Sequence, residues 1–232
     1  MTPILPEPCL CLVTDRSVIK GGRGDLNDLI ERVAQAVEGG VDLVQLREKD
    51  LPGGELLELA ASILAAISGR AKLIVNERAD VALAAGAHGV QLGEDALPVS
   101  AARMTMGSGA LIGRSVHSET GASRAEAGGA DFLIVGAMFA SRSHPGEGPA
   151  GPDLMRRISG SSRLPLIGIG GITPENAPRV IEAGASGVAV ITSILAASDP
   201  KAASARLKEA LREAWCLFGS PAGVGKGGRG KI

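Results

Sequence analysis

Short apolar runs alternate with helix-like segments along most of the chain. The apolar runs lack internal polar alternation, which is typical of strands buried on both faces. They predict strands at 10–14, 43–46, 72–75, 89–92, 111–116, 132–135, 166–169 and 188–191. Apolar positions at i, i+3 and i+4 spacing predict helices at 26–37, 54–68, 80–85, 99–106, 119–126, 153–158 and 175–183, with a closing helix near 207–215.

One junction recurs between a helix and the strand that follows it. It places glycine at the helix end and turns directly into a buried strand. It occurs at 38–42, 85–89, 127–131 and 182–186. The repetition indicates a regular series of strand–helix units.

This series predicts an α/β fold, a single-domain (β/α)₈ TIM barrel. The alternative is a doubly wound open sheet, whose first strand would lead into a GxGxxG turn. Here that strand leads into Asp15-Arg16-Ser17, so the barrel is preferred. We expect the barrel at 9–218, after a proline-rich lead-in at 1–8 and before a disordered Gly- and Lys-rich tail at 219–232.

The stretch 165–176 is the most distinctive part of the chain. Its apolar strand ends in Gly170-Gly171, and Thr173-Pro174 is expected to open a helix with Thr173 as the N-cap. Glycines leave backbone N–H groups uncovered beside a helix N-terminus, so the turn predicts a phosphate site. The following strand leads into Thr192-Ser193, whose hydroxyls would share that phosphate. The alternative is two buried strands with ordinary turns.

Charge and composition exclude several classes of partner. The chain has 24 Lys and Arg against 25 Asp and Glu, so no net field attracts nucleic acid or a membrane surface. Three Phe, one Trp and no Tyr leave little for base stacking, and no apolar run reaches the length of a membrane span. Without a signal-peptide pattern the chain is expected to be cytoplasmic, with Cys9 and Cys11 as buried, reduced thiols.

In a TIM barrel the active site lies at the C-terminal ends of the strands. The residues that follow the predicted strands are rich in cations, amides and hydroxyls. They include Asp15, Gln45, Arg47, Glu48, Lys49, Asn76, Glu77, Arg78, Gln91, Glu94, Asp95, Arg114, Ser115, His117, Ser118, Ser141, Arg142, Ser143 and His144. Together with the glycine turn, this ring predicts an anionic small-molecule substrate.

Five motifs, in their order along the chain, resemble the thiamine phosphate synthase/TenI family. They are Gln45-Leu46-Arg47-Glu48-Lys49, Val75-Asn76-Glu77-Arg78, Gly89-Val90-Gln91-Leu92-Gly93, Ser115-Val116-His117-Ser118 and Ile169-Gly170-Gly171-Ile172-Thr173-Pro174. The resemblance runs from about Leu10 to Trp215. It implies a TIM barrel that binds a thiazole phosphate and, in the synthases, a pyrimidine pyrophosphate with Mg²⁺.

The resemblance also implies roles for individual residues. Phosphate binding would fall to Gly170, Gly171, Thr192 and Ser193. The pyrimidine side would be contacted by Gln45, Arg47, Lys49 and Asn76. Further substrate contacts would come from Ser115, Ser141, Ser143 and His144.

Three positions depart from the synthase pattern. Glu77 stands where synthases carry a Mg²⁺-binding Asp, and Ala96 stands where they carry a second one, unless a shifted loop offers Asp95. His144 stands where their Lys neutralises pyrophosphate. Mg²⁺ demands near-octahedral geometry, and departing pyrophosphate needs fixed cations. These departures therefore favour a reaction that does not release pyrophosphate.

The preferred hypothesis from the sequence is a TenI-like thiazole tautomerase that needs no cofactor. Phosphate anchoring and a proton shuttle suffice for that isomerisation, and the imidazole of His117 fits the shuttle. The alternative is a thiamine phosphate synthase that holds Mg²⁺ through Glu77 and Asp95. A third hypothesis is a non-catalytic barrel that binds a phosphorylated metabolite. In each case the partner is a small molecule, and a homodimer is compatible with the sequence.

Overall fold

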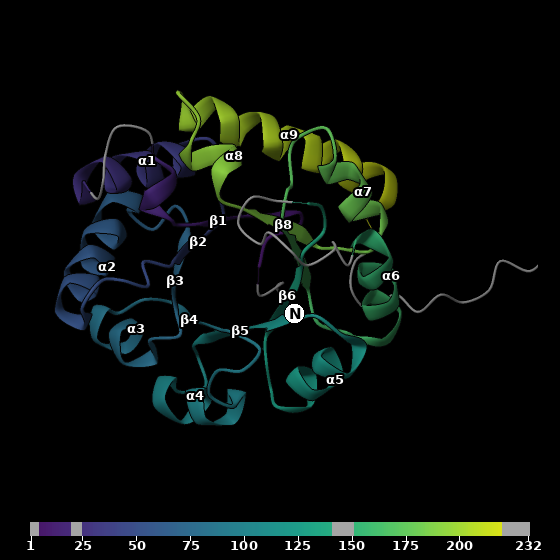
Figure 1. Cartoon of the computed structure of the whole chain (residues 1–232), viewed down its shortest axis with the longest axis horizontal. Coiled ribbons are helices and arrows are strands. Elements are labelled where there is room, and N and C mark those ends of the chain that lie inside the picture. Colours follow the sequence, from purple (N-terminus) through teal and green to yellow (C-terminus); the bar gives the residue numbers. More distant parts are fainter. Residues whose placement is uncertain (1–4, 20–24, 141–150, 220–232) are drawn as a thin grey trace, which may run out of the picture.

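The computed structural model describes residues 5–19, 25–140 and 151–219, and these form a closed parallel barrel (Figure 1). The strand order follows the chain, and β1 pairs with β8 to close the ring. The strands are β1 (Cys9–Val13), β2 (Leu43–Leu46), β3 (Lys72–Asn76), β4 (Gly89–Leu92), β5 (Leu111–Val116), β6 (Phe132–Gly136), β7 (Leu166–Ile169) and β8 (Gly187–Val190). The prediction of a single-domain TIM barrel is confirmed.

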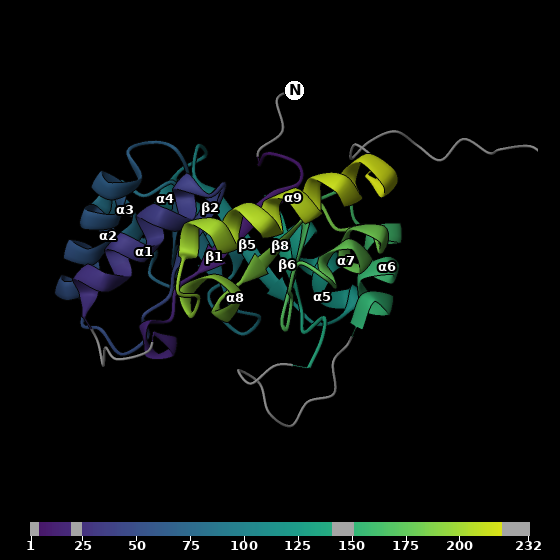
Figure 2. The same cartoon turned by 90° about the horizontal axis from the view of Figure 1, so that it is seen from above.

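Helices surround the barrel on its outside (Figures 1 and 2). They are η1 (Arg16–Val18), α1 (Leu26–Glu38), α2 (Gly53–Ile67), α3 (Ala79–Ala85), α4 (Val99–Met106), α5 (Glu119–Ala127), α6 (Gly151–Ser161), α7 (Ala177–Glu182), α8 (Thr192–Leu195) and α9 (Pro200–Phe218). The longest helix, α9, packs between α1 and α7 and so completes the outer ring.

Apolar side chains fill both sides of the strands. Outward-facing residues pack under the helices, and alternate residues face the barrel axis. The axial cluster contains Leu5, Cys9, Cys11, Val13, Leu43, Ile74, Leu111, Phe132, Ile134, Ile167 and Ala189. Leu5 precedes β1 and is 2% exposed, so the segment before the first strand contributes to the core.

The largest axial side chain, Phe132, requires a glycine on the neighbouring strand. Gly113 of β5 is the register partner of Phe132 on β6. A Cβ atom at Gly113 would lie 2.3 Å from Phe132 Cζ and 2.1 Å from Gln91 Oε1. Close-packed interiors do not tolerate such distances, so only glycine fits at this position.

At the N-terminal end of the barrel, three hydrogen bonds join neighbouring strands. In each, the side chain just before one strand accepts from a backbone N–H of the strand before it in the chain. Asp42 accepts from Leu10 N at 2.7 Å, His88 Nδ1 from Leu73 N at 3.0 Å, and Asp131 from Ile112 N at 2.7 Å. Each acceptor belongs to the recurring helix-to-strand junction. The junction therefore also supplies a side-chain bracket between neighbouring strands.

One of these brackets continues into the outer helices through a buried ion pair. Lys208 of α9 lies 2.6 Å from the Asp42 carboxylate and donates to Pro8 O at 2.7 Å. Its side chain is only 9% exposed. The last helix is thereby fastened to the segment before β1 and to the residue before β2.

The His88 bracket predicts a loss of stability in acid. Burial, followed by the charge of Lys72, lowers the pKa of His88 in the folded state below its ordinary value of 6.5. A protonated imidazole can no longer accept from Leu73 N. The unfolded chain therefore binds more protons, so stability falls as the pH drops through about 6.5 towards the folded-state pKa.

We expect His88→Asn, which keeps an acceptor but does not titrate, to remove this acid-dependent step. The loss in the wild type should be at most about 1 kcal/mol, because the imidazole is only partly buried. Urea unfolding at pH 8 and pH 5 measures it in both proteins. Equal pH dependence in the wild type and the variant would contradict the assignment.

Helix α7 begins later than the sequence predicts. Thr173 is not its N-cap, because residues 173–176 form a turn in which Thr173 O accepts from the N–H groups of Asn176 and Ala177. The helix starts at Ala177, with Asn176 as the N-cap residue and a proline in its first turn. The Asn176 side chain is instead used to hold the preceding loop, as described below.

Two smaller features complete the fold. Cys9 and Cys11 are buried and free, and burial raises the pKa of both thiols, whereas Cys216 is exposed. Among the described residues, no helix has the length and apolar character needed to cross a membrane.

Candidate active site

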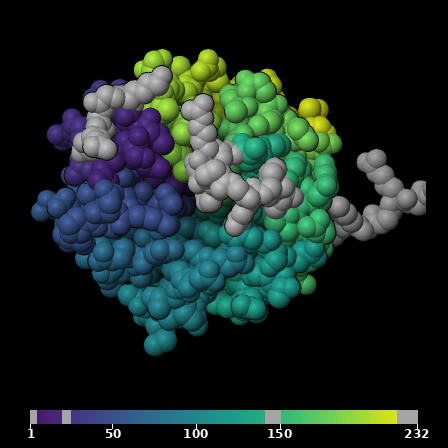
Figure 3. All heavy atoms as spheres, in the orientation of Figure 1, coloured from purple at the N-terminus to yellow at the C-terminus, as the bar shows by residue number. Residues whose placement is uncertain are grey.

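The C-terminal ends of the strands form one end of the barrel, and Figure 3 draws the atoms of the molecule as spheres from the side of Figure 1. Two neighbouring hollows lie there beside the segment that follows β2. The larger, about 510 Å³, is lined by Asp15, Arg16, Ser17, Arg47, Glu48, Lys49 and Asp50. The smaller, about 250 Å³, is lined by Leu46, Arg47, Glu48, Lys49, Leu51, Leu56, Asn76, Glu77 and Arg78. Residues 47–49 thus border both hollows.

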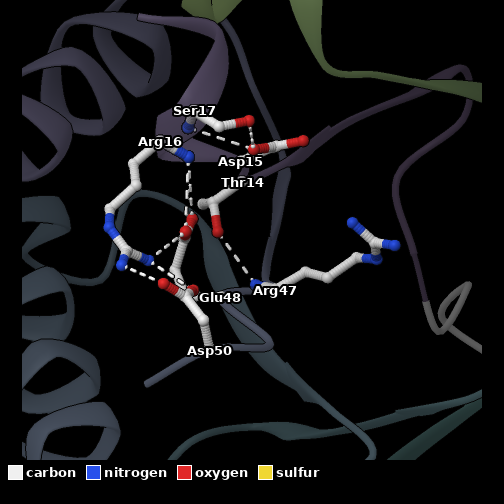
Figure 4. Close-up of polar contacts among 7 residues, drawn as sticks. All are labelled: Thr14, Asp15, Arg16, Ser17, Arg47, Glu48 and Asp50. Atoms are coloured by element: carbon white, nitrogen blue, oxygen red, sulfur yellow. Dashed lines mark hydrogen bonds and ion pairs between the residues drawn. The ribbon is translucent and has the colours of Figure 1, made fainter. Parts of the chain in front are cut away.

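A network around Arg16 holds this segment in place (Figure 4). The Glu48 carboxylate, 3% exposed, accepts from the Arg16 backbone N–H at 3.2 and 3.3 Å and from its Nη1 at 2.9 Å. The same guanidinium forms a fork with Asp50, which raises the pKa of Arg16 and lowers the pKa of Asp50. Arg16 is therefore neutralised inside the protein.

Arg47 and Lys49 alternate along the chain with Glu48 and Asp50, the two partners of Arg16. The Arg47 N–H donates to Thr14 Oγ1 at 2.8 Å, which ties the end of β2 to the end of β1. The Arg47 side chain extends away from Arg16 (Figure 4). In the part of the chain that the structure describes, neither Arg47 nor Lys49 forms an ion pair. Both cations can therefore meet an anionic ligand.

Gln45 and Asn76 lie beside these cations on the two adjoining strands. Gln45 of β2 pairs in register with Val13 and Ile74, and it is 3% exposed. Asn76 ends β3 and borders the smaller hollow. Gln45 lies two residues after the axial residue Leu43, and Asn76 lies two residues after the axial residue Ile74. Residues two apart in a strand share a face, so both amides belong to the inner face of the barrel.

The glycine turn after β7 is rigidly held. Gly170 and Gly171 have φ of +106° and +62°. Asn176 Nδ2 donates to Gly171 O at 2.9 Å, and Thr173 N donates to Asn176 Oδ1 at 2.9 Å. A Cβ at Gly171 would lie 2.6 Å from Ala140 O, so this turn is also packed against the loop after β6.

Thr192 and Ser193 follow β8, as predicted, and begin the short helix α8. Ser193 Oγ donates to Ile172 O at 2.6 Å, which joins the ends of β7 and β8. This bond uses the only hydroxyl hydrogen of Ser193, so the backbone N–H is the group left to face a phosphate. Arg32 of α1 donates to Leu195 O and Ala197 O and supports α8 from outside.

The ends of β4 and β5 carry a second polar group. His117 Nδ1 lies 2.5 Å from Glu94 Oε2, and both side chains are partly exposed. Arg114 donates to Leu97 O at 2.7 Å and also bonds to the carbonyl of Glu94. Arg114 therefore holds the loop after β4. Ser115 accepts from Gln91 on β4 at 3.0 Å.

The two candidate metal ligands, Glu77 and Asp95, have different surroundings. Glu77 has φ of +58°, and its N–H donates to Gln91 O at 2.8 Å. A Cβ at Gly93 would lie 2.4 Å from Glu77 Oε1, so the glycine leaves room for this carboxylate. Asp95 is exposed in the turn after β4. In the ranges that the structure describes, no three His, Cys, Asp or Glu side chains gather as a metal cluster.

Several predicted site residues remain outside this picture, and others were missed. Ser141, Ser143 and His144 lie outside the described residues. Sequence reasoning did not single out Arg16 or Asp50. The available signal was the pair of carboxylates after β2, Glu48 and Asp50, because a carboxylate near the protein interior requires a cation as its partner.

A family model described as thiamine monophosphate synthase matches residues 10–194 of the chain. The thiamine-phosphate synthase of Natronomonas pharaonis is 45% identical over 186 residues, covering 78% of this chain and 86% of that protein. The thiamine-phosphate synthase of Moorella thermoacetica is 43% identical over 197 residues, covering 84% and 91%. A solved structure, thiamine phosphate pyrophosphorylase from Pyrococcus furiosus, is 33% identical, with a TM-score of 0.78 over 89% of this chain and 96% of that one.

These findings overturn the preferred hypothesis of a thiazole tautomerase. The relatives that match most of the chain are named synthases, so the alternative that the sequence left open is better supported. The departures at Glu77, Ala96 and His144 do not outweigh a match to synthases over most of the chain. The prediction of a thiamine-pathway enzyme, with a transferase as one option, is confirmed.

Proposed function

Because this chain belongs to the thiamine monophosphate synthase family, we propose that it joins hydroxymethylpyrimidine pyrophosphate to a thiazole phosphate and releases pyrophosphate. The observation that carries the proposal is the match to synthases over most of the chain. The arrangement of Arg47 and Lys49 supports it, because neither cation is paired among the described residues, whereas the neighbouring Arg16 is paired with Glu48 and Asp50. A cytoplasmic location and a homodimer remain predictions.

We assign the pyrophosphate side of the reaction to the segment after β2. Arg47 and Lys49 would neutralise the charge that develops as pyrophosphate leaves. Gln45 and Asn76, on the inner face of the same strands, would orient the pyrimidine through amide hydrogen bonds. Ser115 would donate to the substrate from β5. Ser141, Ser143 and His144 are proposed as further contacts.

We assign the thiazole phosphate to the ends of β7 and β8. The backbone N–H groups around Gly170 and Gly171, with those of Thr192 and Ser193, would bind its oxygens. Anchoring the phosphate there would place the thiazole at the same barrel mouth as Arg47, since only β1 separates β8 from β2. Holding both reactants in the right orientation converts a bimolecular reaction into an effectively unimolecular one.

Mg²⁺ is proposed as the cofactor, held by Glu77 and Asp95 together with substrate oxygens. The donor chemistry fits, since Mg²⁺ is commonly bound by one or two carboxylates plus phosphate oxygens rather than by an all-protein cage. The space that Gly93 leaves for the Glu77 carboxylate supports this assignment. When bound, the ion would supply positive charge to the pyrophosphate.

The proposed function is tested by incubating the purified chain with both substrates, with Mg²⁺ or with a chelator. Thiamine phosphate and pyrophosphate should appear together, in equal amounts, and only with Mg²⁺. Mass spectrometry and a pyrophosphate assay follow the two products. Intact substrates in the presence of Mg²⁺ would refute the proposal.

Arg47→Met is expected to raise KM for the pyrimidine substrate at least about 10-fold. A hydrogen bond to a charged group contributes about 1.5–3 kcal/mol, and about 1.4 kcal/mol is a factor of ten. Arg157→Met is the matched control, because Arg157 forms an exposed pair with Glu119 on the outer helices. Steady-state kinetics with each substrate varied in turn measure both variants. An unchanged KM in Arg47→Met would remove Arg47 from the site.

A further inference from the structure

Gln91 and Ser115 form a polar pair on the inner face of β4 and β5. Gln91 of β4 is the register partner of Gly113 of β5, and Gly113 lies two residues before Ser115. Only 1% of the surface of Gln91 is exposed. Gln91 Nε2 lies 3.0 Å from Ser115 Oγ and 3.3 Å from Leu92 O. The pair therefore places a buried amide directly beside a hydroxyl that borders the barrel mouth.

The Leu92 carbonyl determines which way the amide faces. A carbonyl oxygen can only accept, so the nitrogen of Gln91, and not its oxygen, must lie beside Leu92 O. The same nitrogen then donates to Ser115 Oγ. A serine hydroxyl has a single hydrogen, and with an accepted bond on its oxygen that hydrogen is directed elsewhere. Among the described residues, the one side-chain hydrogen bond of Ser115 is the one that it accepts from Gln91, so its own hydrogen has no acceptor there.

The other half of the amide is unusual. Gln91 Oε1 is buried without a hydrogen-bond partner in the described part of the chain. It lies where a Cβ of Gly113 would be, next to Phe132. An unpaired buried oxygen lowers stability, and an apolar side chain of similar length would avoid that cost. Packing alone does not account for a glutamine here.

We propose that Gln91 is a positioning residue that fixes Ser115 as a hydrogen-bond donor to an anionic phosphate oxygen of a bound substrate. The inference rests on the proposed function, which brings two phosphate-bearing substrates to this mouth. The amide acts by occupying the acceptor side of the hydroxyl. A carboxylate in its place would accept the Ser115 hydrogen and reverse the direction of the bond.

Gln91→Met tests this, since it removes both the donor and the unpaired oxygen at similar length. We expect unchanged or higher thermal stability, together with a KM about 10-fold higher for one of the two substrates. Ser115→Ala should raise the same KM, and Gln91→Met/Ser115→Ala should be no worse than Ser115→Ala alone. Gln91→Glu should be at least as impaired as Gln91→Met. Gln35→Met is the matched control, because Gln35 lies on α1 and its amide donates only to Glu31, in an exposed hydrogen bond, among the described residues.

Direct binding separates this inference from the proposed reaction. Calorimetry with inorganic pyrophosphate and with inorganic phosphate requires no turnover and shows which substrate group Ser115 meets. Weaker binding of one anion in both single variants supports the inference even for a wild type that makes no thiamine phosphate. Lower stability with unchanged binding and KM, or effects of the two substitutions that multiply, would overturn it.

Discussion

Replacing Gly171 by alanine is expected to lower kcat/KM for the thiazole phosphate by about 100-fold. Gly171 has φ of +62°, and a Cβ there would lie 2.6 Å from Ala140 O and 3.0 Å from Phe139 Cβ. The turn must therefore shift, and a displacement of about 1 Å at a positioned group can cost about 100-fold in rate. The strain itself should lower stability by only about 1–2 kcal/mol, so the variant should fold.

Gly160→Ala provides the control for this experiment. Gly160 lies in helix α6, and nothing comes within 4 Å of a Cβ built there. That substitution should stabilise the protein by about 0.5–1 kcal/mol and leave the kinetics unchanged. Thermal unfolding and steady-state kinetics are measured on both variants. A folded Gly171→Ala variant with wild-type kcat/KM would show that the phosphate binds elsewhere.

The largest loss of stability is expected from Lys208→Ala. Removing this buried ammonium leaves the Asp42 carboxylate without its ion-pair partner and leaves Pro8 O unbonded. Breaking a buried ion pair costs about 3–5 kcal/mol. For a domain of this size about 1 kcal/mol corresponds to a shift of about 2–4 °C in Tm, so a clear drop is expected.

Lys201→Ala is a closely matched comparison, because Lys201 also lies on α9 and pairs with a carboxylate, Glu38. That pair is exposed, so its loss should cost at most about 1 kcal/mol. Lys208→Met, which keeps much of the buried stem, separates the loss of charge from the loss of packing. Urea unfolding measures all three variants. Equal losses at 201 and 208 would mean that the buried pair contributes no more than a surface one.

The barrel was predictable because its determinants are local. Each strand is a short apolar run, and several helices end at the glycines of the recurring junction, which the sequence displays. Helix α4 and the strands β2, β4, β5 and β7 were predicted with the bounds that the structure has. The N-cap of α7 was not, because Asn176 is committed to Gly171 O across a loop, which no local pattern reports.

The site was only partly predictable, because its decisive contacts join distant segments. Gln45, Arg47 and Asn76 were predicted as site residues from their places at or near strand ends, and their roles stay predictions. The pairing of Arg16 with Glu48 was not predicted, because it crosses from β1 to β2. The choice of reaction was wrong for another reason. Side chains that differ from a family pattern were interpreted as lost chemistry, although a carboxylate such as Glu77 can still serve where the substrate supplies the remaining ligands.

Gly113 and Phe132 also constrain how this chain can evolve. Any side chain at position 113 meets the Phe132 ring at 2.3 Å and the Gln91 oxygen at 2.1 Å, so that substitution alone is blocked. Only after Phe132 has been replaced by a smaller residue, and Gln91 has moved or changed, can position 113 accept a larger one. The order of mutations is thereby restricted, and the three positions are epistatic. Change in the barrel core and change in the Gln91–Ser115 pair must proceed together.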